Sequence, residues 1–538
     1  MLRRAYGLLF LAWLCFLCRA GWHAALLPLW EGFDEWAHVA YLQRLASGQG
    51  LPLPGQTRVS REVQASLSLT PMPAVPLSTP HYTHGQYWRL PPAERTELRR
   101  RLISTPRQWA IEEDPAGELN YEAQQPPLYY LTLAPFERAF ASLPLPERVL
   151  ALRLVGVLLA SLAVPLTCAA VHAATGSVPA AAAGAALAAA MPLPAMTAAR
   201  VGNDALSMVL FAALLWVLAR AGPQRGFRHA LAAGVLLGVG LLTKAYFLTA
   251  IPALATIYGW RLLRHSGRRA VAAAQATILF GTAGLLSFWW HWRNLRLTGS
   301  WSGLQQTAGQ SSSLADLLQQ ALHVDWLRFA EISFRTHVWI GHWSFLQLRA
   351  WMYGVFAVFY LLAVTGLLLL WLRRRKHRQT TGWRGLGAAA LICGWFWLGL
   401  AYHEVTFARL GLSSSAGWYA VAIISAEAVL LAAGWSALDR GRLWLLAAAT
   451  ALFALLDLYA TNFLLVPYYT GLIAYGPSGR LASFHLSQLA NGGAALFLGR
   501  AGGSVLPLPL NVVLWCLHAA ATVALPFVAV RAAKTNPH

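Results

Sequence analysis

Long apolar runs separated by polar segments recur along the chain from residue 6 to residue 530. A helix needs about 20 mainly apolar residues to cross the hydrocarbon core of a bilayer, so each run predicts a membrane-spanning helix. About twelve runs qualify, and those at 229–243 and 246–260 are short. The predicted spans are 6–27, 149–172, 178–198, 204–220, 229–243, 246–260, 270–290, 351–372, 385–402, 416–437, 443–464 and 507–530. This pattern predicts an all-α polytopic membrane protein.

Three connections between the runs are long, at roughly 28–148, 291–350 and 465–506. The first contains stretches at 35–46 and 94–103 that we expect to be amphipathic helices on the membrane face. Long loops usually have a function, so the first loop is the predicted working surface. The resulting division is a first helix (1–27), an outer loop (28–148), a transmembrane core (149–300), a second loop (301–350) and a C-terminal transmembrane region (351–538) that includes loop 465–506.

Composition supports a membrane protein and argues against nucleic-acid binding. Of 538 residues, 57% are hydrophobic and 12% charged, against about 25% charged in soluble domains. The net charge of +21 comes from 42 basic residues, 39 of them Arg, which gather between the apolar runs. Such clusters are topology signals. The excess of Arg over Lys is typical of a GC-rich bacterial genome. The five Cys all lie in apolar runs without metal-ligand spacing.

The basic clusters also predict which loops face the cytoplasm. With Arg3 and Arg4 inside, every second connection is cytoplasmic, and these connections carry most of the positive charge. The residues concerned are Arg220, Arg225, Arg228, Arg261, Arg264, Arg268, Arg269, Arg373, Arg374, Arg375, Lys376, Arg378, Arg384, Arg440, Arg442, Arg531 and Lys534. Because the first run lacks a cleavage site, we expect a retained helix, both termini in the cytoplasm and the long loops on the periplasmic face of the inner membrane.

An acidic cluster follows the first span directly. Asp34, Glu35 and His38 stand at helical spacing, with Asp34 and His38 on one face. Partial desolvation at the membrane boundary raises the proton affinity of a carboxylate, which suits a general base. The same residues also fit an N-cap and first-turn acids that open an interfacial helix.

A second polar group precedes another expected helix. Pro126 and Pro127 are placed to start it, and Tyr129 and Tyr130 are expected as aromatic anchors at headgroup depth. Glu122 and Gln125 would then face whatever lies under the first loop. A plain helix start explains the same residues.

A further polar group lies between two apolar runs. Arg200, Asn203 and Asp204 include an acid close to a span, which needs a partner. Asp204 either pairs with Arg200 to pack two helices together or forms a second acidic site that faces the first acidic cluster.

Cations are also found at the predicted membrane surface. Lys244, one of three lysines, lies between two short spans, where it either binds phosphate or snorkels to headgroups. Arg293 adds a cation at the outer interface, and His403 with Glu404 form a later polar pair.

The order of these motifs along the chain is similar to that of a known family. The acidic cluster is followed by Q-P-P-L-Y-Y at 125–130, a helix onset around Arg153, N-D-A-L at 203–206, L-L-T-K at 241–244 and W-R-N at 292–294. Over residues 1–300 the chain resembles the GT-C superfamily of integral membrane glycosyltransferases. It is most similar to the branch that contains protein O-mannosyltransferases and the lipid A aminoarabinose transferase.

The resemblance implies a sugar transfer from a polyprenyl-phosphate donor on the outer face, usually with inversion. Asp34 would match the first-loop acid, which acts as base or orients the acceptor, and Asp204 the second-loop acid. Lys244, with Arg293 and Arg200, would hold the donor phosphate. The substrate-binding candidates are His38, Glu122, Gln125, Tyr129, Asn203, His403 and Glu404. Trp36 stands where many members have a small residue or Pro, so the choice between Asp34 and Glu35 stays open.

A transporter, flippase or binding protein for lipid-linked glycans is the alternative. Such transporters tend to have midplane charges and internal repeats, whereas the acids here gather at one interface. This difference favours the enzyme. The sugar, the acceptor (lipid, protein or polysaccharide) and a need for a divalent metal are left open.

Overall fold

The computed structural model describes residues 2–75, 77–107, 116–220, 226–264, 269–303, 313–377, 383–476 and 478–536. Each of the twelve predicted spans contains a helix. They are α1 (Leu2–Leu26), α7 (Leu145–Ser161) with α8 (Ala163–Thr175), α9 (Val178–Ala190) with α10 (Pro192–Ala198), α11 (Asp204–Arg220), α12 (Gly226–Leu241), η2 (Ala245–Thr249) with α13 (Ala250–Arg264), α14 (Arg269–Thr298), α17 (Ala350–His377), α18 (Trp383–Ala408), η6 (Gly417–Ile423) with α19 (Ile424–Leu438), α20 (Trp444–Ala460) with η7 (Thr461–Leu465) and α21 (Val466–Tyr469), and α23 (Leu508–Lys534).

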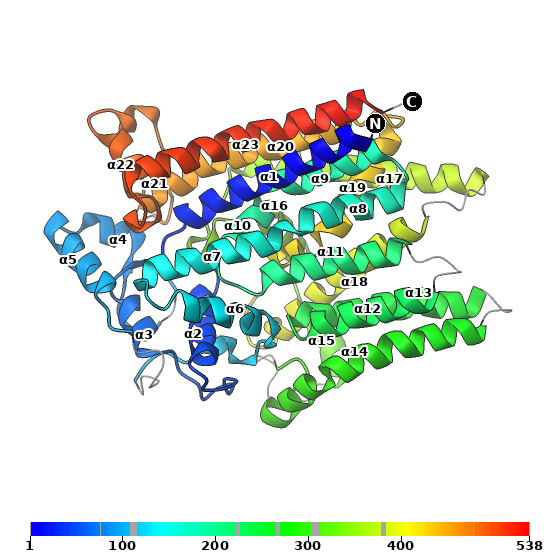
Figure 1. Ribbon diagram of the computed structural model, residues 1–538, viewed down its shortest axis with the longest axis horizontal. Coiled ribbons are helices and arrows are strands. Elements are labelled where there is room, and N and C mark those ends of the chain that lie inside the picture. Colours follow the sequence, from blue (N-terminus) through cyan, green and yellow to red (C-terminus); the bar gives the residue numbers. More distant parts are fainter. Residues whose placement is uncertain are drawn as a thin grey trace.

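The all-α polytopic fold is therefore confirmed, and the number of crossings is smaller by a strict criterion. Within the described residues, eight helices are long and apolar enough to cross a membrane, or nine if the bent α9–α10 pair is one span. The other three predicted spans correspond to α11, α12 and α13, which have 17, 16 and 15 residues. These shorter helices run beside the longer ones (Figure 1).

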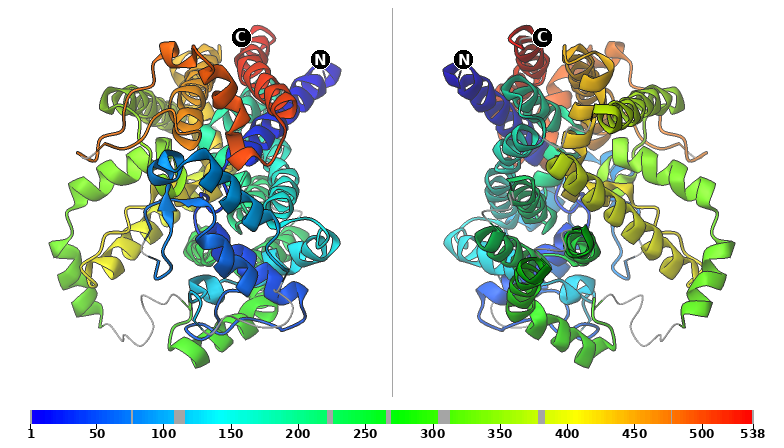
Figure 2. Two further views of the ribbon diagram at one scale, coloured as in Figure 1. Left: turned by 90° about the vertical axis from the view of Figure 1, so that its left-hand side faces the viewer. Right: turned by 90° about the vertical axis from the view of Figure 1, so that its right-hand side faces the viewer.

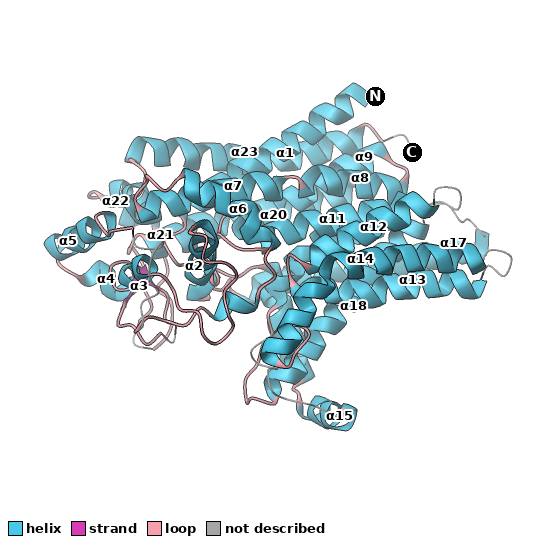
Figure 3. Cartoon of the chain, turned by 60° about the horizontal axis from the view of Figure 1, so that its bottom comes forward, coloured by secondary structure: helices cyan, strands magenta, loops and turns pink. Residues whose placement is uncertain are grey.

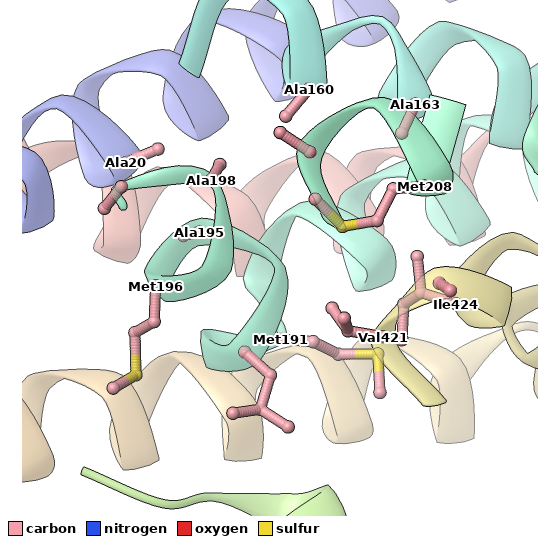
Figure 4. Packing of buried hydrophobic residues seen from close by; sticks show 14 of the residues in the cluster. Ala20, Ala160, Ala163, Met191, Ala195, Met196, Ala198, Met208, Val421 and Ile424 are labelled. Carbon is pink, nitrogen blue, oxygen red and sulfur yellow. The ribbon is translucent and has the colours of Figure 1, made fainter. Parts of the chain in front are cut away.

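Small side chains let the central helices pack closely. Eleven of the thirteen residues of α9 are buried, and all but one of those eleven are Ala or Gly. Pro192 and Pro194 follow, and the chain bends by 60° between α9 and α10, because proline cannot continue the helical hydrogen-bond ladder. Figure 4 shows methionine and alanine side chains from this region filling the space around the bend. The bend directs the chain toward the loop that precedes α11.

The long connections contain the remaining elements. The first holds α2 (Glu35–Ala46), α3 (Arg61–Leu67), β1 (Pro71–Met72), β2 (Tyr82–Thr83), α4 (His84–Arg89), α5 (Pro92–Ile103), η1 (Tyr121–Gln124) and α6 (Leu128–Ala139). The two strands pair in parallel, Pro71 with Tyr82 and Met72 with Thr83. The later connections hold α15 (Leu314–His323), α16 (Trp326–Val338), η5 (His342–Ser344), η8 (Leu486–Leu489), α22 (Gly493–Gly499) and η9 (Ala501–Ser504). Helix α15 projects from the bundle (Figure 3).

The first-loop elements gather at one end of the bundle and both chain ends lie at the other (Figures 1 and 2). Contacts agree with this arrangement, because Asn536 near the C-terminus donates to the carbonyl of Gly441, in a basic connection. Arg225, Arg268 and Arg378 lie outside the described residues. The arrangement places the basic connections opposite the large loop, as the charge pattern predicts.

Helix α2 differs from the expectation of a helix lying on the membrane face. Ten of its twelve residues are buried, and it packs against α6 and η1. Helix α5, over the second predicted stretch, buries only Leu98 and Leu102. Thus α2 is an internal element, and its first residues face the protein interior.

Candidate functional site

A cavity of about 720 Å³ lies where the first loop meets α11, η2, α18 and η6. Its wall includes many aromatic side chains. Eight of the residues singled out in the sequence line it: Asp34, His38, Glu122, Gln125, Arg200, Asp204, Lys244 and His403. Glu35, Tyr129, Asn203, Arg293 and Glu404 are not among its lining residues. The tertiary structure thus brings together groups from five separate parts of the sequence.

Asp34 stands at the start of α2 with its side chain directed to the cavity. Its backbone is left-handed, with φ 60°, and its side chain makes no capping hydrogen bond, so the N-cap explanation of this acid does not describe its contacts. Instead Oδ1 accepts a hydrogen bond of 2.8 Å from the Tyr121 hydroxyl. Burial raises the pKa of the Asp34 carboxyl, and the Tyr121 hydrogen bond opposes part of that rise.

Glu35, the next residue, has a different environment. It is fully buried, and Arg153 donates to both oxygens, at 2.7 Å from Nε to Oε1 and 2.5 Å from NH2 to Oε2. The backbone N–H of Val201 also donates to Oε1, at 3.0 Å. The Glu35 carboxylate therefore connects α2, α7 and the loop before α11.

Asp204 holds two cations at the cavity wall. Its Oδ2 accepts from Arg200 and its Oδ1 from Lys244, both at 2.6 Å. Arg200 also donates to the carbonyl of Phe33 at 2.7 Å, which ties the pair to the first loop. Both of the alternatives open for Asp204 describe it in part, because it pairs with Arg200 and also faces the first acidic cluster.

Lys244 reaches the cavity because the helix stops before it. Helix α12 ends at Leu241, and Lys244 has an extended backbone before η2 begins. Its Nζ lies 4.4 Å from the centroid of the Tyr246 ring and 5.9 Å from that of Tyr419. The two rings favour a cation at this point.

The tyrosines of the Q-P-P-L-Y-Y motif are structural parts of the site. Tyr129 and Tyr130 are both fully buried, unlike the aromatic anchors at headgroup depth that the sequence predicts for both. The Tyr129 hydroxyl accepts from the N–H of Gly202 at 3.0 Å, and the Tyr130 hydroxyl lies 2.7 Å from His38 Nδ1. The sequence gives Tyr121 no distinct role, since one tyrosine among many carries no local signal.

Glu122 and the side-chain amides of Gln125 and Asn203 complete this side of the site. Asn203 donates to Gln125 at 2.9 Å and to the carbonyl of Thr243 at 3.1 Å. One oxygen of Glu122 is buried without a hydrogen-bond partner in the described chain, 4.0 Å from His38. Burial, with the nearby Asp34 charge, raises the pKa of Glu122 to about 8, so its neutral form is favoured at pH 7.

Arg293 and Glu404 lie outside the cavity. Arg293 donates to the carbonyl of Pro52 at 2.6 Å and lies over the Trp290 ring. Glu404 accepts from the Ser413 hydroxyl at 2.8 Å and the Ser414 N–H at 2.7 Å, so it holds the turn after α18 beside His403.

One group of metal-type ligands occurs within the described residues, away from this cavity. His23, Asp457 and His518, from α1, α20 and α23, place their ligand atoms within 4.8 Å of one another. Arg19 also pairs with Asp457 at 3.0 Å. Since the guanidinium already neutralises the carboxylate, the group is better described as a buried hydrogen-bonded ion pair than as a metal centre.

Comparisons with known proteins bear on the middle of the chain. Residues 125–292, about a third of it, match the family model described as dolichyl-phosphate-mannose-protein mannosyltransferase. This segment contains the Q-P-P-L-Y-Y, N-D-A-L and L-L-T-K motifs and ends at Trp292 of W-R-N. The resemblance to the GT-C glycosyltransferases is thereby confirmed over these residues. No curated protein matches the chain.

Two solved structures resemble the chain weakly. ArnT from Cupriavidus metallidurans bound to undecaprenyl phosphate has a TM-score of 0.46 and 14% identity, covering 99% of this chain and 76% of that chain. The apo structure of the same protein has a TM-score of 0.40 and 14% identity, covering 88% and 74%. The roles of the cavity residues are therefore argued from their own contacts.

Proposed function

We propose that this protein is a membrane glycosyltransferase that transfers a sugar from a polyprenyl-phosphate donor to an acceptor on the periplasmic face of the inner membrane. One observation carries the proposal. A carboxylate with an oxygen free for proton transfer (Asp34) and a pair of cations held by Asp204 line the same 720 Å³ cavity. The family match over residues 125–292 supports the reaction class.

Asp34 is the proposed general base. The acceptor hydroxyl or amine attacks the anomeric carbon and gives its proton to Asp34, while the bond from that carbon to the phosphate oxygen breaks and its electron pair leaves with the phosphate. Attack from the face opposite the leaving group inverts the anomeric centre. Glu35 fits this role poorly because Arg153 and a backbone N–H occupy both of its oxygens.

Lys244 and Arg200 are the proposed phosphate ligands. Positive charge is needed where negative charge grows on the leaving phosphate. Asp204 has both oxygens engaged by these two cations, so we assign it to positioning them. Arg293 lies outside the cavity, so a role on the donor phosphate would need a movement of α14.

The cavity has a wall that suits a lipid donor. Leu248, Pro252 and Leu398 line it on η2, α13 and α18, and Leu398 is 59% exposed. These apolar side chains would pack against the isoprenoid chain of a donor whose phosphate reaches Lys244.

Transfer by purified protein tests the proposal. The protein in nanodiscs would receive polyprenyl-phosphate hexoses and pentoses with candidate lipid, peptide and polysaccharide acceptors, with and without a divalent-metal chelator. Mass spectrometry would follow the released polyprenyl phosphate. We expect turnover by the wild type, its loss in Asp34→Asn and normal rates in the exposed control Glu97→Gln.

Other outcomes would separate the alternatives. Donor binding without release of polyprenyl phosphate, the same in wild type and Asp34→Asn, would favour the carrier or binding protein. Turnover retained in Asp34→Asn and lost in Glu35→Gln, with both variants folded, would overturn the assignment of the base.

A further inference from the structure

A second cavity, of about 230 Å³, lies between α4, α5, the ends of α1 and α21, the start of α7 and the turn at 500–505 before α23. It shares no lining residue with the cavity described above. Arg95, Arg99 and Arg500 line it, and Glu147 is the single acid among its described lining residues. We call it the arginine cavity.

Its three arginines are held by backbone carbonyls. Arg95 donates through Nη1 to the carbonyls of Trp88 at 3.0 Å and Leu90 at 2.6 Å. Arg500 donates through Nη1 to the carbonyl of Thr470 at 3.1 Å, and Arg99 donates through Nη2 to the carbonyl of Ser504. Each guanidinium uses one nitrogen in these bonds, so N–H groups remain for a ligand.

Trp88 brings two of the cations close together. The guanidinium carbons of Arg95 and Arg500 lie 5.4 Å and 4.4 Å from its ring centroid, and its indole N–H is fixed by a 2.9 Å hydrogen bond to the carbonyl of Tyr469. The structure shows no ion pair to these three arginines within the described residues. In contrast, Arg100 on the same helix pairs with Glu97 at 2.7 Å.

Three cations in a partly desolvated cavity repel one another unless an anion joins them. Burial and the Arg95 charge lower the pKa of the Arg500 guanidinium, in agreement with this crowding. Glu147 adds a second requirement, because its Oε2 is buried with no hydrogen-bond partner in the described chain. A buried acceptor of this kind calls for a donor.

We propose that the arginine cavity binds a polar group that carries a phosphate or carboxylate together with a hydroxyl or ammonium donor. The anion meets the three arginines, and the donor meets Glu147. Leu102, Ile103 and Val505 give the cavity an apolar side, which suits the first methylene groups of the acyl chains of a lipid. A soluble anion such as a glycerol phosphate has the same chemistry. This inference does not depend on the proposed sugar transfer.

Two binding measurements on the full chain distinguish the sources. In phosphatidylcholine nanodiscs, calorimetry would titrate soluble sn-glycerol 1-phosphate. In a second arm, phosphatidylglycerol would be mixed into the nanodiscs, and native mass spectrometry would count the molecules retained by the protein. Loss of one charge-assisted contact predicts binding roughly tenfold weaker in Arg99→Gln and in Arg500→Gln. Arg100→Gln on the exposed side of α5 is the matched control and should bind as the wild type does.

Binding in either arm with this pattern supports the proposal, and the arm that responds identifies the source. Absence of binding in both arms overturns it. A loss in Arg100→Gln equal to that in Arg500→Gln also overturns it, because it would indicate general surface attraction. Thr96→Trp fills the cavity without removing a charge, so it keeps the test decisive if the arginine variants do not fold.

Discussion

The Glu35 carboxylate and the Arg153 guanidinium form a buried two-point ion pair, at 2.7 Å and 2.5 Å, between residues 118 positions apart. The adjacent acid, Asp34, forms no such pair with any described residue and faces the 720 Å³ cavity. Two consecutive acids are thereby separated into one that links the first loop to α7 and one that is open to a substrate.

Exchanging each acid for its amide should affect different properties. Glu35→Gln leaves the Arg153 charge buried without its counter-ion, which destabilises a protein by about 3–5 kcal/mol. Asp34→Asn should change the free energy of unfolding by less than about 1 kcal/mol and abolish turnover. Thermal unfolding in nanodiscs, measured beside transfer rates, checks both. Equal stability of the two variants would contradict the structural role of Glu35.

The Lys244 ammonium should be needed for donor binding. Lys244→Ala removes a charge-assisted contact to the donor phosphate, worth about 1.5–3 kcal/mol, so donor affinity should fall about 10- to 150-fold. Lys244→Arg should recover part of it. Equilibrium binding of a labelled polyprenyl phosphate measures the effect. Arg293→Gln serves as the comparison, and an equal loss there would instead assign the phosphate to α14.

The Tyr121 hydrogen bond should set the acid limb of the pH profile. The bond stabilises the Asp34 carboxylate, so Tyr121→Phe should raise the Asp34 pKa further above its usual range. A general base works only when deprotonated, and activity therefore rises with pH through that pKa. The acid limb of kcat/KM should shift upward by about one pH unit or less in Tyr121→Phe. An unshifted limb would argue against Asp34 as the titrating base.

Glu122 should make stability fall as pH rises. Its pKa is about 8 in the folded protein, against an ordinary value of 4.5, so between these two pH values the folded state binds the proton and the unfolded state does not. The free energy of unfolding then decreases with increasing pH, by at most about 1.4 kcal/mol per pH unit. Melting temperatures from pH 5 to 9 should fall less steeply in Glu122→Gln. Parallel curves for both proteins would assign the effect to other groups.

The Arg19–Asp457 pair should support the bundle and not the chemistry. Asp457 accepts from Arg19, His23 and His518 between α1, α20 and α23. Asp457→Asn leaves Arg19 without a counter-ion inside the helix bundle and should destabilise it by about 3–5 kcal/mol. Donor affinity of the folded fraction should not change. The double change Arg19→Met with Asp457→Leu should recover much of the melting temperature. A loss of donor affinity in this double variant would contradict a purely structural role for the pair.

The sequence by itself determined the helices and the candidate groups. Apolar runs place all twelve helical segments because burial in a bilayer depends on local composition. The L-L-T-K and N-D-A-L motifs indicated Lys244 and Asp204 because a charge beside an apolar run needs a partner or a function. The internal position of α2 was not predictable, since its apolar face fits a protein interior as well as a membrane surface.

The tertiary structure decided which groups meet. Lys244 and Asp204 are 40 residues apart and Tyr121 and Asp34 are 87 apart, and no periodicity encodes such pairs. The same holds for the arginine cavity, where Arg99 of α5 donates to the carbonyl of Ser504, 405 positions along the chain. Local pattern determines secondary structure because hydrogen bonding and burial act over a few residues. Ion pairs and cavities depend on how distant helices pack, so only the folded chain distinguishes Asp34 from Glu35.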